Sequence, residues 1–185
     1  DPRDVIASLK KMPWWNNSLN YSAFNWKLAI RHGINARMNT KLDEYLELRY
    51  EDLLAEPERE LQRVCQFLGE TYDPAMLQFQ KISQQTVPEY KMDWHSATRE
   101  PLNTSSIGRW DKDLSKEEVS IVEWATGKEM VQLGYTLSEA QEPDFQLRNR
   151  YETEARTFKA KQLRLEMTDS IFSFFYRWET DYRMG

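Results

Sequence analysis

The chain alternates between segments with helical spacing of apolar residues and polar segments that contain proline or glycine. Residues 4–12 predict a short helix that Pro13 ends, and Ser18 can cap the next helix, which runs to about Met38. The apolar face of that second helix recurs every three or four positions and consists of Ala23, Trp26, Ile30 and Ile34. The pattern therefore predicts two helices before residue 40.

A period-two alternation occurs in YLELRY, residues 45–50. Leu46, Leu48 and Tyr50 would point to one side of an extended chain, so we expect a strand with Tyr50 at its carboxyl end. A parallel strand needs neighbours on both sides and helices on both faces. We therefore expect further strands upstream of Asp1.

Local start and stop signals bound the remaining helices. Pro57 is suited to a first helical turn and Gly69 to a helix end, with Cys65 in the apolar stripe between them. Ser115 followed by Glu118 predicts the start of a helix that Gly134 closes, with Val119, Val122 and Met130 inside it. Residues 70–108 are expected to be mostly loop with one or two short helices, and residues after 144 are expected to be helical again.

Composition excludes several classes of function. The 185 residues can form one domain with its own core, and a net charge of −5 disfavours general nucleic-acid binding. Cys65 is the single cysteine, expected to be buried, and His32 and His95 are too few and too far apart for a zinc cluster, so no metal is expected. The sequence contains no apolar run long enough to span a membrane.

Three separated stretches carry a resemblance to a known family: DPRDVIAS at 1–8, LRYEDLLAEPERELQRVCQFLG at 48–69 and NTSSIGRWDKDLS at 103–115. Together they resemble the C-terminal half of a sulfotransferase that uses 3′-phosphoadenosine 5′-phosphosulfate (PAPS). The resemblance implies an α/β fold, a P-loop NTPase-like parallel sheet with flanking helices, of which this segment is mostly helical. It also predicts residues 1–140 as part of the sulfotransferase domain and 141–185 as a helical C-terminal extension.

The first stretch resembles a family motif in which an Arg and a Ser hold the 3′-phosphate of the cofactor. The Ser corresponds to Ser8, and the Arg would stand immediately before Asp1. The family's phosphosulfate-binding loop and catalytic base would also lie upstream, so no catalytic residue is assigned to this chain. Ser8 is expected near a helix start, where unpaired N–H groups and the helix dipole favour an anion.

The resemblance implies that the other two stretches contact the cofactor. Tyr50 would lie beside its nucleotide, and NTSSIGRW would form a loop over the 3′-phosphate, with Arg109 as a cationic fork and Gly108 allowing close approach. The expected cofactor-binding residues are Ser8, Tyr50, Asn103, Thr104, Ser105, Ser106, Gly108 and Arg109. The cytosolic branch of the family has an R-K-G triplet at positions 103–105, so this chain is more similar to the tyrosylprotein and bacterial carbohydrate branch.

Neighbouring residues have simpler interpretations. Arg3 is expected to form a surface ion pair with Asp1 or Asp4, and Trp110 is expected to pack rather than to bind a ligand.

Glu51 and Asp52 could act as an acid/base or magnesium pair, but their place after the predicted strand favours anchoring of the turn and the next helix. His95 is a weak candidate for a base because no orienting partner is visible.

The resemblance implies transfer of a sulfuryl group from PAPS to a hydroxyl or amine of an acceptor, releasing 3′-phosphoadenosine 5′-phosphate. The acceptor could be a carbohydrate, a peptide tyrosine, a lipid or a small molecule, selected by residues 70–102 and the tail. The alternative is a non-catalytic helical interaction module. A P-loop kinase would need a G-x-x-x-x-G-K-[ST] stretch, which this sequence lacks.

The tail from residue 141 combines bases and acids in its first half with aromatic residues in its second. This mixture favours a helical arm packed on its own domain or in a homodimer over a membrane-surface helix. The location of the protein stays open, with the cytoplasm favoured if the protein is bacterial.

Overall fold

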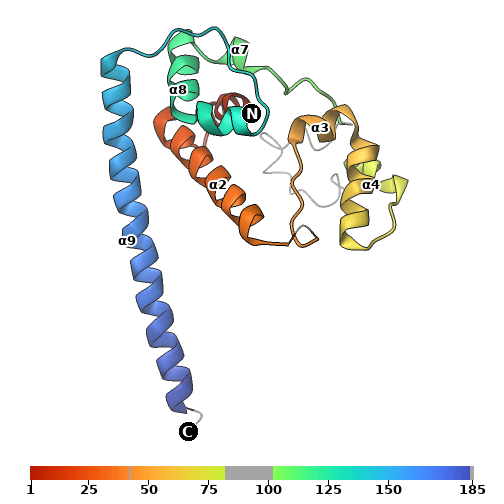
Figure 1. Ribbon diagram of the computed structural model, residues 1–185, viewed down its shortest axis with the longest axis vertical. Helices are drawn as coiled ribbons and strands as arrows, with labels where there is room; N and C mark the ends of the chain where they lie inside the picture. Colours follow the sequence, from red (N-terminus) through yellow and green to blue (C-terminus); the bar gives the residue numbers. More distant parts are fainter. Residues whose placement is uncertain (42, 82–101, 184–185) are drawn as a thin grey trace. The chain divides into compact units, whose positions relative to one another are not determined.

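The computed structural model describes residues 1–41, 43–81 and 102–183, with side chains described as far as residue 165. The described part is mostly helical and contains no strand (Figure 1). Its elements are α1 (Pro2–Lys10), α2 (Leu19–Asn39), α3 (Tyr50–Ala55), α4 (Pro57–Leu68), η1 (Pro74–Gln78), α7 (Trp110–Asp113), α8 (Lys116–Gln132) and α9 (Phe145–Arg183). None of the described helices is long and apolar enough to span a membrane.

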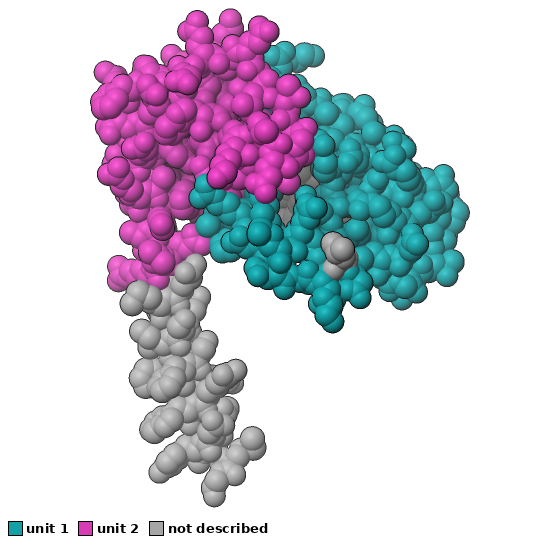
Figure 2. Space-filling view, viewed as in Figure 1, with its two compact units in different colours: residues 1–16, 28–115 teal, residues 17–27, 116–185 magenta. Residues whose placement is uncertain are grey.

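The chain forms two compact units (Figure 2). Unit 1 contains residues 1–16 and 28–115, and unit 2 contains residues 17–27 and 116–185. The predicted division into residues 1–140 and 141–185 stays a prediction.

The predicted helix boundaries of unit 1 are largely confirmed where local signals set them. Pro57 occupies the first turn of α4, and Gly69 ends that helix with a φ of 72°, a conformation that glycine adopts readily. Cys65 is buried, as expected, and its Sγ lies 3.8 Å from the sulfur of Met76 in the short helix η1. Leu68, at the end of the predicted apolar stripe, is exposed. His95 and most of the predicted acceptor loop lie outside the described residues.

The strand predicted at residues 45–50 is wrong. Residues 45–49 are irregular, and Tyr50 begins α3. Arg49 does have extended backbone angles, with φ −86° and ψ 133°, but no strand pairs with it among the described residues. Glu51 and Asp52 lie in the first turn of α3, where acidic side chains stabilise a helix start. The parallel sheet expected from the resemblance therefore stays a prediction.

Unit 2 is built around α8 and the first half of α9. Val119, Val122 and Met130 lie within α8, as predicted, and all three are buried. Trp124 of α8 packs edge-to-face on Tyr151 of α9, with ring centroids 5.8 Å apart. The start of α2 packs on the same long helix through another set of contacts. These are the ring pairs of Tyr21 and Phe24 with Phe158, and the hydrogen bond from Ser18 to Glu154.

Ser18 also accepts a hydrogen bond from the backbone N–H of Tyr21 at 3.1 Å, which confirms its predicted role as the cap of α2. The helical nature of the tail is likewise confirmed by α9.

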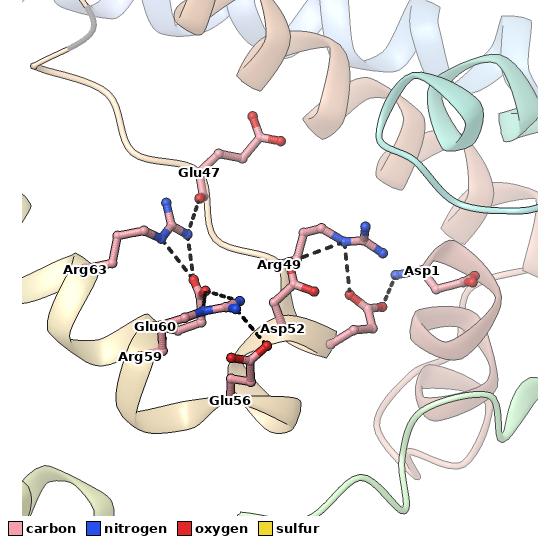
Figure 3. A network of polar contacts seen from close by, with 9 residues as sticks. Asp1, Glu47, Arg49, Asp52, Glu56, Arg59, Glu60 and Arg63 are labelled. Atoms are coloured by element: carbon pink, nitrogen blue, oxygen red, sulfur yellow. Dashed lines mark hydrogen bonds and ion pairs between the residues drawn. The ribbon is translucent and has the colours of Figure 1, made fainter.

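A buried carboxylate stabilises the start of α4. Glu60 is 4% exposed and lies between two guanidinium groups, those of Arg59 and Arg63 (Figure 3). Arg63 also donates to the backbone carbonyl of Glu47 at 2.9 Å, which joins the irregular segment before α3 to α4. The hydrogen bonds from Arg63 and then Arg59 lower the pKa of Glu60.

We expect acid to destabilise unit 1 through Glu60. Because the pKa of Glu60 is lower in the folded chain than its ordinary value of 4.5, the unfolded chain takes up the proton first. The stabilisation is complete above that ordinary value and is lost as the pH falls through the folded pKa. Urea unfolding between pH 6 and pH 3 should therefore show a steeper loss of stability in the wild type than in Glu60→Gln.

The matched control is Glu58→Gln, which changes an exposed carboxylate on the same helix. It should keep the pH profile of the wild type. An unchanged profile in Glu60→Gln would contradict the role of this ion network.

Candidate functional site

The start of α1 is fixed by a buried ion pair. The Asp1 carboxylate caps the helix by accepting from the backbone N–H of Arg3 at 2.9 Å, and it also accepts two hydrogen bonds from the Arg3 guanidinium, at 3.0 and 2.6 Å. The predicted pairing of Arg3 with Asp1 is confirmed, but the expected surface position is wrong. Arg3 is only 5% exposed, and its guanidinium stacks over the Trp110 ring at 4.1 Å.

Asp4 holds the predicted loop against α1. Its two carboxylate oxygens accept hydrogen bonds from the backbone N–H of Gly108, at 2.8 Å, and of Trp110, at 3.0 Å. Arg3 thus contacts the ring of Trp110 and Asp4 binds its backbone N–H, which agrees with the predicted packing role of Trp110. Gly108 has a φ of 72°, so the loop turns at this point.

Tyr50 joins the loop from the other side. Its hydroxyl lies 3.1 Å from the Ser106 hydroxyl, although Tyr50 as a whole is 56% exposed. Glu51, the next residue, lies with a carboxylate oxygen 2.8 Å from the backbone nitrogen of Asp1, so the starts of α3 and α1 lie side by side.

The first part of the loop is organised by its own side chains. The Asn103 carboxamide oxygen accepts from the backbone N–H of Ser105 at 3.0 Å and from the Ser105 hydroxyl. The backbone N–H of Ile107 donates to the Thr104 carbonyl at 3.0 Å, which forms a turn. Asn103 and Ser105 therefore shape the loop, while the Ser106 hydroxyl faces Tyr50.

Arg109 belongs to a cluster of three charged side chains, Lys11, Arg109 and Asp113, which we call the Asp113 cluster. Both cations donate to the same carboxylate oxygen, Asp113 Oδ2, Lys11 at 2.6 Å and Arg109 through Nε at 3.0 Å. The hydrogen bond from Lys11, followed by the one from Arg109, lowers the pKa of Asp113. Asp113 is therefore ionised at neutral pH.

Ser8 lies in the last turn of α1, not near the helix start that was predicted. The expected support from unpaired N–H groups is therefore absent at Ser8, because the end of a helix presents carbonyl groups. Ser8 nevertheless follows Asp4 by four residues, a spacing that places both on one face of the helix. Its side chain is exposed.

The structure thus brings most of the predicted site residues together within unit 1. Asp4, Lys11 and Asp113 complete the arrangement, and the sequence interpretation did not include them. The signal for Asp4 and Lys11 was the helical spacing around Ser8, since Asp4 precedes it by four residues and Lys11 follows it by three.

An open hollow lies elsewhere in unit 1, at the start of α4. It is lined by Glu56, Pro57, Glu58, Arg59, Gln62 and Leu77 and contains none of the predicted site residues. Its two glutamates disfavour an anionic ligand.

Comparisons with known proteins bear on the first part of the chain. Neither the search of curated proteins nor the search of solved structures found a match. A family model does match, over residues 1–74, which include α1, α3 and α4. The matching model is that of the sulfotransferase family, and it supports a sulfotransferase in general.

Proposed function

We propose that this protein transfers a sulfuryl group from PAPS to a hydroxyl or amine of an acceptor. The family match supports sulfuryl transfer. The resemblance implies PAPS as the donor. The hydroxyl and guanidinium groups of the candidate site in unit 1 support this choice. Hydroxyl groups and an Arg fork are the donors that a phosphate monoester needs.

The observation that carries the proposal is the attachment of the loop at 103–110 to both α1 and α3. Asp4 of α1 accepts hydrogen bonds from the loop backbone, and Tyr50 at the start of α3 contacts the loop residue Ser106. A segment more than fifty residues away in the sequence thereby meets the elements that contain Ser8 and Tyr50. We assign the 3′-phosphate of the cofactor to this place.

The roles of the individual residues follow from which of their hydrogen-bond donors are not already used within the protein. The N–H of Gly108 already donates to Asp4, so we assign Gly108 to the turn of the loop and not to phosphate binding. Arg109 uses Nε on Asp113, and its fork carries further N–H groups that can meet an anion. Ser8 and Ser106 would add hydroxyl donors. Asn103, Thr104 and Ser105 would set the path of the loop.

In such a transfer the protein mainly positions the groups and neutralises charge, as in phosphoryl transfer through a loose, in-line transition state. The residues named here would hold the nucleotide while the bond to sulfur breaks. We assign no catalytic base to this chain.

The finer features of the resemblance belong to the proposal as well. These are the P-loop NTPase-like sheet, the similarity to the tyrosylprotein and bacterial carbohydrate branch, and a homodimer formed through α9. The acceptor class stays open among carbohydrate, peptide tyrosine, lipid and small molecule.

Calorimetric titration of the intact protein with 3′-phosphoadenosine 5′-phosphate tests the proposal. We expect binding to the wild type and a loss of about 10-fold or more in affinity for Arg109→Ala, because a hydrogen bond to a charged group is removed. Arg150→Ala is the matched control. Arg150 donates through Nε to Glu154, four residues on, at 3.0 Å, as Arg109 does to Asp113, but it lies in unit 2.

Equal affinity for Arg109→Ala and the wild type would contradict the assigned site. Absence of any binding heat would favour the non-catalytic interaction module.

A further inference from the structure

One face of α1 contacts the segment at 108–113 at two points. Asp4 accepts from the backbone of Gly108 and Trp110, and Lys11 donates to Asp113. Ser8 lies between these contacts along the same helix face, because Asp4, Ser8 and the C-cap residue Lys11 are spaced by four and then three positions. Its side chain is exposed, so a ligand can reach it from solvent.

The Asp113 cluster carries an excess of positive charge at the end of α1, where Lys11 is the C-cap residue. Two cations share one carboxylate, which leaves one positive charge within the three residues. Lys11 is 47% and Arg109 38% exposed, so both can reach a ligand from solvent. Asp113 is only 18% exposed and holds both cations on a single oxygen. The side chains of Lys11 and Arg109 are therefore already ordered, which lowers the entropic cost of binding a ligand.

The position of Ser8 makes a second cation necessary. The carbonyl end of a helix carries roughly half a negative charge, and Ser8 lies in the last turn of α1. An anion bound there is repelled by the helix end unless nearby cations exceed that charge. Arg109 is already partly neutralised by Asp113, and Lys11 is the cation that α1 itself brings to the same carboxylate.

We propose that Lys11 binds the 3′-phosphate of the nucleotide together with Ser8 and Arg109. This inference rests on the proposed function, and it adds a residue that neither the sequence motif nor the family match assigns. Lys11 would keep its hydrogen bond to Asp113 and direct another N–H of its ammonium group to a phosphate oxygen. Its contribution would depend on the 3′-phosphate and not on the adenosine or the 5′-phosphate.

The test compares two nucleotides on the intact protein by calorimetry, 3′-phosphoadenosine 5′-phosphate and adenosine 5′-phosphate, at low and at moderate salt. We expect Lys11→Ala to weaken binding of the bisphosphate about 10-fold and to leave binding of the monophosphate unchanged. Lys11→Arg, which retains the charge, should restore most of the affinity. The dependence of bisphosphate affinity on salt should be shallower in Lys11→Ala, because one charge contact is gone.

Lys10→Ala is the matched control, since Lys10 is the adjacent exposed lysine on another face of α1. It should change bisphosphate affinity less than 2-fold. The inference alone is overturned if bisphosphate binding depends on Arg109 and is unaffected by Lys11→Ala. If the wild type does not bind the bisphosphate at all, the proposed function and this inference both fail.

Discussion

Asp4→Ala is expected to release the loop at 103–110 from α1 and to weaken binding of 3′-phosphoadenosine 5′-phosphate by at least about 10-fold. The substitution removes the acceptor of two backbone N–H groups, those of Gly108 and Trp110. It should also lower the free energy of unfolding by about 2 kcal/mol, since hydrogen bonds to a charged group are lost. Calorimetry measures the first effect and urea unfolding the second.

Asp4→Asn should fall between the wild type and Asp4→Ala, because a carboxamide keeps one acceptor oxygen of the two. Asp111→Ala is the control, since it removes an exposed aspartate from α7, next to the loop that Asp4 holds. Wild-type affinity in Asp4→Ala would show that the attachment of the loop does not matter for the ligand.

Met130→Ala is expected to be the most destabilising single change in unit 2. Met130, with 0% exposure, is the largest fully buried side chain among the residues whose side chains the structure describes. Truncation to Ala removes buried methylene groups and leaves a cavity, which costs about 2–5 kcal/mol. For a chain of this length the midpoint of thermal unfolding should fall by roughly 4–20 °C, as measured by circular dichroism.

Val131→Ala is the matched control because this neighbouring residue of α8 is 60% exposed. A surface truncation of this kind stays within about 0.5 kcal/mol. A small loss of stability in Met130→Ala would mean that neighbouring side chains fill the cavity left by the substitution, and it would contradict this prediction.

Sequence patterns predicted the elements whose boundaries are set by local chemistry. The α4 helix begins at Pro57 and ends at Gly69 because each residue acts on its own backbone. The cap at Ser18 and the buried positions of α8 are local in the same sense. Such features need no information from distant parts of the chain.

The segment at 45–50 shows where a local pattern is insufficient. Alternation of apolar and polar residues favours an extended backbone, and Arg49 is extended. A strand, however, exists through hydrogen bonds to another strand, and the pattern contains no information about that partner. Tyr50 instead joins the helix that the acids after it favour.

The sequence named Ser8, Tyr50 and the loop residues as a candidate site, and that assignment stays a prediction, but it did not predict the contacts that join these residues. The contact between Tyr50 and Ser106 agrees with the prediction that both residues lie near the same ligand. The attachment through Asp4 spans 104 residues, so neither end carries a sequence signal for the other. The stacking of Arg3 on Trp110 likewise joins two residues more than a hundred positions apart.

The turn at Gly108 has a stereochemical consequence. An added Cβ would meet no atom within 4 Å, so space is not what restricts this position. With φ at 72°, an L-amino acid here would be strained by roughly 1–2 kcal/mol, whereas the mirror-image residue D-alanine prefers such angles. Chirality at a single α-carbon, rather than crowding, thus governs which residues position 108 accepts.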